Sequence, residues 1–354
     1  MSPFLGVGRK TEGANKMALS IGSYAKLSWY PFSDEPVIKS IWYMNRLGDP
    51  SILLPNESPD QKWHLFGHTF LGIVHFISEN GISWQPRRMI ELRGHSPSIY
   101  VEDGVYYLLY EKHDAFPSQL DSFFTKRTKK KAVSHSRIEV RSSTDLVLFS
   151  EPKIILDSRE IPFAIDGLGR PRVSRPQLFK EKDLYTLFFG ASHVVLADTN
   201  HKASRYFASA TSSALLGPYE VTNNNKPLIE PDGDDPNRSL AVGSVRVIQA
   251  SDGYVAIQCG KYWDKELKRS SSSVIQIESS DGVTWLPSTR PQILTPPPSG
   301  WASRYIISCD ARYKADEGCV YCYFSASSKK RFFPTKEAIG LLLGKDPALR
   351  KVFF

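Results

Sequence analysis

A four-strand pattern that recurs five times is the feature that most limits how this 354-residue chain can fold. Each copy has a short first strand, an aromatic-rich second strand, and two further strands separated by turns. In the second copy, Ser96–Val101 and Val105–Tyr110 flank an Asp103-Gly104 turn. Alternating apolar and polar residues, β-branched and aromatic side chains and Asp-Gly or Asn-Gly turns all indicate strands.

Repeated four-stranded units of this kind are typical of the blades of a β-propeller. We therefore predict an all-β fold: a five-bladed β-propeller of four-stranded antiparallel blades. The fifth copy shows only three good strands, so we expect an N-terminal strand at 37–43 to close the ring. The predicted blades are residues 48–92, 94–157, 172–230, 240–295 and 301–345, with 1–36 as an N-terminal extension and 346–354 as a tail. A pair of β-sandwiches is the rival architecture.

Composition limits which cellular compartment and which binding partners we expect. The net charge of +8 permits an anionic partner but does not require one. Four cysteines are too few for a disulfide scaffold, and Cys319 and Cys322 would point to opposite faces of one strand, so we expect structural thiols. No apolar run approaches the ~18 residues of a membrane helix, and residues 1–26 lack a signal-peptide block. We expect a cytoplasmic protein.

The first strand of each propeller blade lines the central channel, so polar residues at the strand starts should converge on one funnel. The candidates are Asp49, His95 with Ser96, Arg175, Ser244 and Arg304. Asp49 precedes Pro50, which favours an extended start to the strand. We predict a carboxylate aimed into the funnel, as a base or a nucleophile. The alternative is an Asp that caps a turn.

Several segments resemble the five-bladed propeller glycosidases, of which glycoside hydrolase family 43 is the best known. The resemblance covers roughly residues 40–345. The segments that carry it are Gly48-Asp49-Pro50-Ser51-Ile52, Ser96-Pro97-Ser98-Ile99-Tyr100, Arg175-Pro176-Gln177-Leu178-Phe179, Gly217-Pro218-Tyr219 and Ser279-Ser280-Asp281-Gly282-Val283-Thr284-Trp285. It implies a general-base Asp on blade one, an Asp on blade two that tunes the acid, and a Glu general acid on blade three.

Only the first of these three residues has a counterpart, at Asp49. The blade-two position reads His95-Ser96-Pro97 and the blade-three position reads Ser174-Arg175-Pro176. Arginine cannot act as a general acid near neutral pH. The usual pair of carboxylates is therefore incomplete at its usual places.

Another group must then supply the proton if the chain is a glycosidase. Glu111, His113 and Asp114 follow the second strand of blade two, and His193 and Asp198 lie in the matching loop of blade three. A histidine such as His95 can also protonate a leaving group. We take Asp49, Glu111, His95 and Asp114 as the candidate catalytic residues. Hydrogen bonding at the rim is the alternative role for all but Asp49.

Sugar or phosphate binding needs a second set of side chains. Trp263 and Trp301 could stack on a sugar ring, whereas Trp84 and Trp285 occupy equivalent turns and are expected to pack. An anion cradle of Arg46, Arg175, Arg304 and Lys261 would suit a phosphorolytic enzyme or an anionic sugar. The predicted substrate-binding residues are Arg46, His113, Arg175, His193, Trp263, Trp301 and Arg304.

Other ligands find less support. The basic run at 126–131 has no aromatic platform around it, so we do not expect nucleic acid as a partner, nor a membrane. The acidic segment 231–236 lacks the spacing of an EF-hand and is expected to be a turn-rich loop. We expect no metal site and no cofactor. A channel-bound calcium ion, which the resemblance allows, stays as the one alternative.

We thus predict a carbohydrate-active protein that acts on a glycosidic bond, with Asp49 as the general base. The mechanism would be inverting hydrolysis if the base and the acid stand ~6.5–9.5 Å apart with a water between them. Three alternatives remain: a glycan-binding propeller without activity, a phosphate-dependent glycoside phosphorylase, and a protein-interaction propeller. Fold alone does not choose among them.

Overall fold

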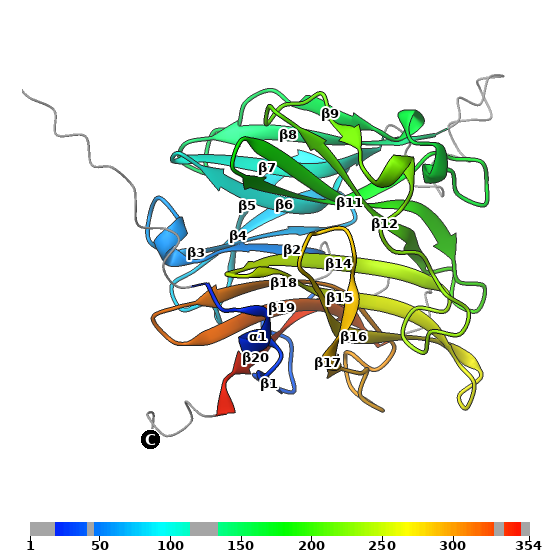
Figure 1. Ribbon diagram of the computed structural model, residues 1–354. Helices are drawn as coiled ribbons and strands as arrows, with labels where there is room; N and C mark the ends of the chain where they lie inside the picture. Colours follow the sequence, from blue (N-terminus) through cyan, green and yellow to red (C-terminus); the bar gives the residue numbers. More distant parts are fainter. Residues whose placement is uncertain (1–17, 41–45, 114–133, 329–335, 348–354) are drawn as a thin grey trace, which may run out of the picture.

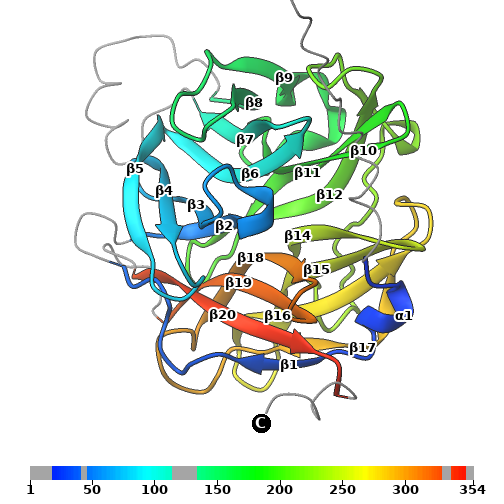
Figure 2. The ribbon, with the colours of Figure 1, turned by 90° about the vertical axis from the view of Figure 1, so that its left-hand side faces the viewer.

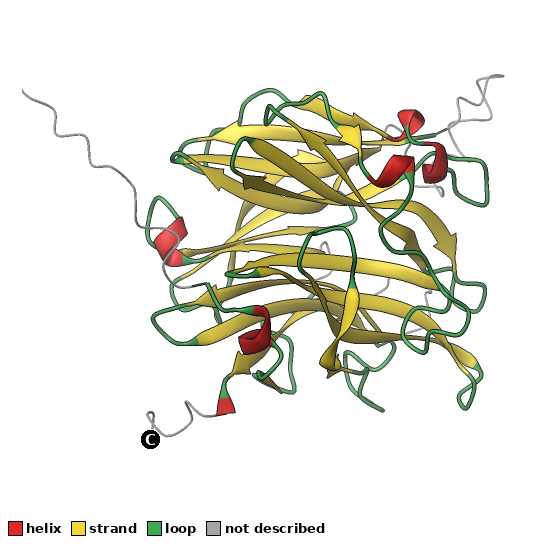
Figure 3. Ribbon diagram, viewed as in Figure 1, coloured by secondary structure: helices red, strands yellow, loops and turns green. Residues whose placement is uncertain are grey.

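In the described residues, twenty strands form five four-stranded antiparallel sheets that stand around a common axis (Figures 1, 2 and 3). The computed structural model describes residues 18–40, 46–113, 134–328 and 336–347. Each sheet pairs its strands in order from the axis outward, as a propeller blade does. The predicted all-β, five-bladed fold is confirmed.

Each of the first four blades is one continuous stretch of chain. Blade one contains β2 (Gly48–Leu53), β3 (Trp63–His68), β4 (Gly72–Ser78) and β5 (Gln85–Leu92). Blade two contains β6 (Gly94–Glu102), β7 (Val105–His113), β8 (Ser136–Ser143) and β9 (Lys153–Asp157). Blade three contains β10 (Val173–Glu181), β11 (Leu184–Val195), β12 (Lys202–Ser212) and β13 (Glu220–Val221). Blade four contains β14 (Ala241–Ala250), β15 (Gly253–Asp264), β16 (Arg269–Ser279) and β17 (Leu286–Leu294).

Helical structure in the described residues is limited to single turns. The α-helix α1 spans Ile21–Tyr24, and the 3-10 turns are η1 (Pro55–Glu57), η3 (Ser158–Glu160), η4 (Pro162–Ala164) and η5 (Asn223–Asn225).

Blade five joins the two ends of the described chain. It contains β18 (Tyr305–Lys314), β19 (Cys319–Ser327), β20 (Glu337–Lys345) and, as its outer strand, β1 (Ser28–Pro31). An N-terminal strand therefore closes the ring, as predicted, but the strand lies upstream of the expected segment 37–43. From that segment Ile38 makes only an isolated bridge to Ile339, and residues 41–43 lie outside the described residues.

The register of β1 explains why the closing strand lies at this position. Trp29 stands opposite Gly344 of β20, where the absence of a side chain leaves room for the indole ring. An aromatic side chain that covers a cross-strand glycine shields it from water and pins the register. Trp29 also packs against the core between blades four and five.

The apolar cores lie between neighbouring blades. One core joins blades four and five and contains Cys259, Cys309 and Cys322; all four cysteines are buried and none forms a disulfide. Trp84 and Trp285 each donate the indole N–H to a glycine carbonyl of their own turn, at 3.0 and 3.1 Å. Their rings pack against aromatic neighbours, which is the packing role expected of them.

Polar side chains line the axis below the funnel. The inner strand of each blade has no neighbouring strand on its axis side, so its N–H groups there need other partners. Ile99 N donates to Ser51 Oγ at 3.0 Å, Val247 N to Gln177 Oε1 at 2.8 Å, and Ile52 N to Asp310 Oδ2 at 2.7 Å. In each pair the acceptor side chain belongs to the preceding blade of the ring.

If β1 closes the ring, Trp29→Ala should lower the free energy of unfolding by about 2 kcal/mol, because the half-buried indole leaves a gap over Gly344. Trp263→Ala is the matched control, since that ring is 45% exposed on β15. Thermal unfolding followed by circular dichroism compares the two. Equal melting temperatures for both variants would contradict this account of the closure.

Candidate functional site

Three of the inner strands bend in the same way where they enter the funnel. β2, β6 and β10 each carry a bulge, between Gly48 and Ser51, between His95 and Ser98, and between Ser174 and Gln177. The first residue inside each bulge has a left-handed backbone: φ is 46° at Asp49, 48° at Ser96 and 51° at Arg175.

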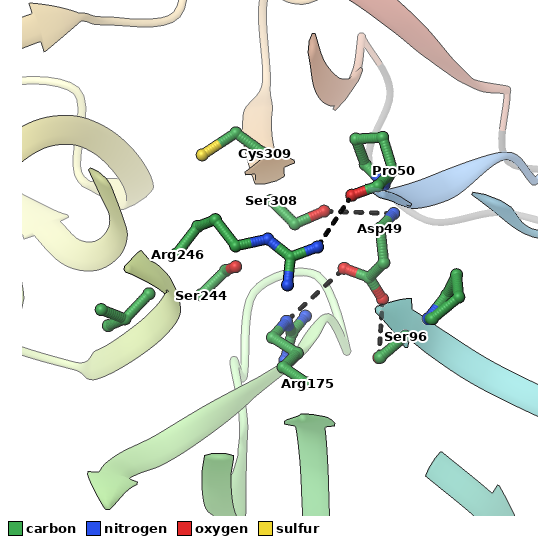
Figure 4. A pocket seen from close by; sticks show the side chains of 10 residues that line it. Asp49, Pro50, Ser96, Arg175, Ser244, Arg246, Ser308 and Cys309 are labelled. Atoms are coloured by element: carbon green, nitrogen blue, oxygen red, sulfur yellow. Dashed lines mark hydrogen bonds and ion pairs between the residues drawn. The ribbon is translucent and has the colours of Figure 1, made fainter. Parts of the chain in front are cut away.

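This conformation is unfavourable for residues with a side chain. In the bulge of β14 the left-handed residue is instead the second one, Gly243, with φ of 78°, where an added Cβ would lie 2.0 Å from a backbone oxygen. Strain of this kind costs of order 1–3 kcal/mol per residue and clusters at functional sites. The fold thus accepts strain at three equivalent positions, and it brings those three side chains together at the axis (Figure 4).

Asp49 is the centre of this group. Its Oδ2 accepts a hydrogen bond from Ser96 Oγ at 2.8 Å and lies 3.0 Å from His68 Nδ1. Its Oδ1 lies 3.5 Å from Arg175 Nε. Burial by itself raises the pKa of the Asp49 carboxyl, but the charges of Arg175 and His68 outweigh it and hold that pKa well below its usual range. Asp49 is therefore ionised at neutral pH although only 6% of it is exposed.

Glu111 lies on the other side of the same serine. It stands opposite His95 in the pairing of β6 with β7, and its Oε2 is 3.4 Å from Ser96 Oγ. Its Oε1 is hydrogen-bonded to His113 Nε2. Burial raises the pKa of Glu111, but His113 more than offsets it, so that pKa is strongly lowered. Glu111 is thus a second buried, ionised carboxylate.

A guanidinium fixes the proton on His113. Arg172 donates to His113 Nδ1 at 3.1 Å, and an arginine nitrogen can only donate. The Nδ1 atom of His113 is therefore the accepting nitrogen, and Nε2 faces Glu111. Both ring nitrogens are occupied, so this histidine holds Glu111 in place and has no nitrogen left for a ligand.

The two carboxylates do not face each other across an open gap. Both approach one hydroxyl group, Ser96 Oγ, from two sides. The space beside Asp49 has a volume of about 20 Å³, which is room for one water molecule. Its lining also includes Ser244, Arg246 and Ser308 (Figure 4). Ser308 Oγ accepts a hydrogen bond from the backbone N–H of Asp49 at 3.1 Å.

Two further histidines at the rim, His95 and His193, are held neutral. The ring of His95 lies 5.2 Å, centroid to centroid, from those of both His68 and His113. Although His95 and His193 keep some accessible surface, the protein around them removes most of their water. Desolvation lowers the pKa of His95 well below its usual range and that of His193 to about 3. His95 is therefore poorly suited to the proton-donor role considered for it.

The four cations of the predicted anion cradle are not gathered around one space. Arg46 pairs with Glu337 at 3.4 Å, and Arg304 with Asp198 at 2.7 Å. Buried Lys261 donates to Ile306 O at 2.7 Å, and burial lowers its pKa to about 8. Only Arg175 lines the space at Asp49, where it also donates to Ser204 Oγ at 2.8 Å.

The tryptophans lie apart from Asp49. Trp301 stacks on Phe324 at 5.4 Å within the core between blades four and five. Trp263 is exposed on β15 and does not line the space at Asp49.

Asp114 lies outside the described residues, as does the basic run at 126–131. The structure thus groups Asp49, Glu111, His95, His113 and Arg175, with His193 electrostatically coupled to Glu111.

His68 is the functional candidate that the sequence interpretation missed. It ends β3 and stands opposite Gly48 in the pairing with β2, which places it beside Asp49. The same signal, a polar residue at the end of a second strand, pointed to Glu111 on blade two. His68 is 5% exposed, and its Nε2 has no hydrogen-bond partner among the described residues.

The floor of the funnel is a buried ion pair that was also not expected. Arg246 Nε lies 2.9 Å from Asp310 Oδ1, and both residues are buried. Arg246 also donates to Ser98 Oγ at 3.2 Å. Within the described parts of the chain, no group of three or more metal-ligating side chains is found, and no helix is long and apolar enough to span a membrane.

Comparison with solved structures finds this fold among glycoside hydrolases. A family 117 glycoside hydrolase from the marine bacterium Zobellia galactanivorans has a TM-score of 0.55 at 16% identity, with 91% of this chain and 92% of that chain covered. A thermostable family-43 glycoside hydrolase has a TM-score of 0.54 at 13% identity, with 83% and 88% covered. A family 32 β-fructofuranosidase from Bombyx mori has a TM-score of 0.56 at 14% identity, and the match covers 87% of this chain and 61% of that chain.

The fold is that of the five-bladed propeller glycosidases. No family model matches the sequence, and no curated protein does. At these identities the likeness concerns the fold alone. The resemblance read from the strand motifs is confirmed at this level.

The buried neutral histidines predict how stability depends on pH. Desolvation lowers the pKa of His75, which is fully buried on β4, to about 3, like that of His193. Between pH 6.5 and 3 the unfolded chain takes up these protons and the native state does not, so stability falls as pH falls. At pH 5 the loss from His75 alone is about 2 kcal/mol.

Urea unfolding at pH 7 and pH 5 measures this loss. The lowered pKa values of Asp49 and Glu111 change the stability only below about pH 4, so they do not contribute between pH 7 and pH 5. His75→Gln should flatten the pH dependence. A wild-type chain equally stable at both pH values would show that these rings are protonated in the native state.

Proposed function

We propose that this chain acts on a glycosidic bond of a carbohydrate at the centre of the funnel, with Asp49 as the working carboxylate. The observation that carries the proposal is the contact of Asp49, Ser96 and Arg175 from three strained and equivalent bulges. Keeping a buried carboxylate ionised is energetically costly, and such groups cluster at functional sites. The solved structures that share the fold are glycoside hydrolases, which favours a carbohydrate as the ligand.

The charge state of each group suggests its role. Asp49 stays ionised, as a general base or a nucleophile must. Glu111 is also ionised and is held by His113, so we assign it to positioning Ser96 rather than to donating a proton. Arg175 is suited to binding a sugar hydroxyl next to Asp49.

His68 is our candidate for the proton donor. Its Nδ1 lies 3.0 Å from Asp49 Oδ2, and its Nε2 has no hydrogen-bond partner among the described residues. An imidazole placed next to a reacting oxygen can serve as a general acid. In this scheme a proton moves from Nε2 to the glycosidic oxygen as the bond between that oxygen and the anomeric carbon breaks. A water molecule then supplies hydroxide to the sugar and returns a proton to the pair.

A glycan-binding propeller without activity is the second candidate. It is favoured by the contact of Arg175 with Asp49 and by the space of about 20 Å³ beside them, which a sugar must enlarge to enter. Phosphorolysis has less support, because three of the four cations considered for phosphate have other partners.

Asp49→Asn should lower turnover by about 10²–10⁴-fold, because it removes the charge and nearly keeps the shape. Reducing-end release from arabinan, xylan, fructan and pectin panels measures turnover. Asp316→Asn, in the turn between β18 and β19, is the control, since it disrupts another carboxylate–cation pair, with Lys314, and Asp316 does not line the space at Asp49. Equal turnover by wild type and Asp49→Asn would exclude Asp49 as the base. A wild-type chain that binds a glycan of the panel and cleaves none would favour the second candidate.

His68→Asn separates proton donation from positioning. The asparagine amide replaces Nδ1–H beside Asp49 but has no proton to give. We expect natural glycosides to react about 10²-fold more slowly and nitrophenyl glycosides to react almost normally, because nitrophenolate leaves without protonation. An equal loss on both substrates would assign His68 a purely structural role.

A further inference from the structure

A cleft lies at the outer edge of the ring, between blades four and five. Its volume is about 350 Å³, within the range of small-ligand sites. The segment from α1 to β1 forms one wall, and β16 and β17 form the other; Figure 2 shows β1, β17 and α1 at this edge of the ring. The cleft shares no lining residue with the space at Asp49.

A buried amide occupies a place where the neighbouring positions are apolar. Val274 and Gln276 are two residues apart on β16 and so share one face of the strand. Val274 packs in the core between blades four and five, whereas Gln276, 2% exposed, lines the cleft. A polar side chain buried between blades costs stability wherever one of its polar atoms lacks a hydrogen bond.

Hydrogen bonds orient two amides at the cleft. Gln292 Nε2 donates to Leu294 O at 2.9 Å and to Val274 O at 3.3 Å, two carbonyls that can only accept, and Gln276 Nε2 donates to Ser288 Oγ at 3.3 Å. Neither amide oxygen accepts a hydrogen bond from the described part of the chain. Two oriented acceptors therefore remain for a ligand that brings its own donors.

The remaining side chains that line the cleft also suit a sugar. Trp29 and Tyr30 bring aromatic surface, and the exposed Arg290 brings a planar group of donors. A polyol with apolar ring faces matches amide acceptors, guanidinium donors and aromatic rings at the same time. A purely apolar ligand would leave the amides unpaired, and a free phosphate would meet the acceptor oxygens.

We propose that this cleft is a second carbohydrate-binding site, which holds a short stretch of a polysaccharide chain away from the funnel. The choice of ligand rests on the proposed function, but the cleft needs no catalysis. Two sites on one rigid ring raise the avidity for a long chain that reaches both. Arg290 predicts a preference for chains that contain uronic acids, whose carboxylate pairs with a guanidinium.

Affinity gel electrophoresis in native gels that contain arabinan, xylan, fructan or pectin tests the proposal. The measurements use the full-length Asp49→Asn chain, so that cleavage does not interfere. Gln276→Leu is added because leucine has a similar volume and suits the apolar face beside Val274. Gln249→Leu, at an exposed glutamine of the same blade, is the matched control. Unchanged melting temperatures verify that the variants fold.

We expect at least one polysaccharide to retard Asp49→Asn and Gln249→Leu, and Gln276→Leu to weaken that binding at least about fivefold. If no gel retards the chain, or if both glutamine variants are retarded equally, the cleft is a water-filled packing gap and the proposal is overturned. Should Gln276→Leu lower binding while wild type cleaves nothing, the second site stands and the proposed activity falls. If cleavage depends on Asp49 and Gln276→Leu does not change binding, the proposed activity stands and the second site is overturned.

Discussion

The unpaired inner edges of the five blades are the constraint on which this ring depends. Each inner strand presents backbone N–H groups to the axis, where no neighbouring strand accepts their hydrogen bonds. Polar side chains at or just after the bulges supply the acceptors: Ser51 and Gln177 end their bulges, and Asp310 lies two residues after the bulge of β18. Each of them accepts a hydrogen bond from a backbone N–H of the next blade. Arg246 neutralises Asp310, so the charge is not left unpaired in the centre.

This polar layer also closes the floor of the funnel and thereby shapes the site above it. A buried ion pair is not stabilising by itself, because desolvation offsets most of the attraction. Its value here is geometric: Arg246 contacts Ser98 of blade two, and Asp310 contacts Ile52 of blade one. Directly above, the bulges at Asp49, Ser96 and Arg175 place their side chains against one another. The site is thus carried by strained backbone that rests on a rigid floor, a common arrangement where precise positioning matters.

The sequence predicted what depends on local pattern. Alternation, turn dipeptides and the repeat sufficed for five blades, and the place of Asp49 at the start of the first inner strand sufficed to select it. The closing strand was misplaced because Trp29 fits over Gly344, a match between residues far apart in the chain. For the same reason the pairing of Arg304 with Asp198 and of Arg46 with Glu337 was not foreseen. Composition cannot tell a cation that is free to bind phosphate from one that already has a partner.

Crystals of the wild-type chain soaked in concentrated arabinose, xylose or fructose test the central claim most directly. The account predicts a sugar ring in the funnel, with a hydroxyl group within about 2.6–3.2 Å of the Asp49 carboxylate and Arg175 moved to contact the ring. A funnel without any sugar, in which Asp49, Ser96 and Arg175 keep their mutual contacts, would contradict it. Those contacts would then serve the stability of the ring rather than chemistry on a glycosidic bond.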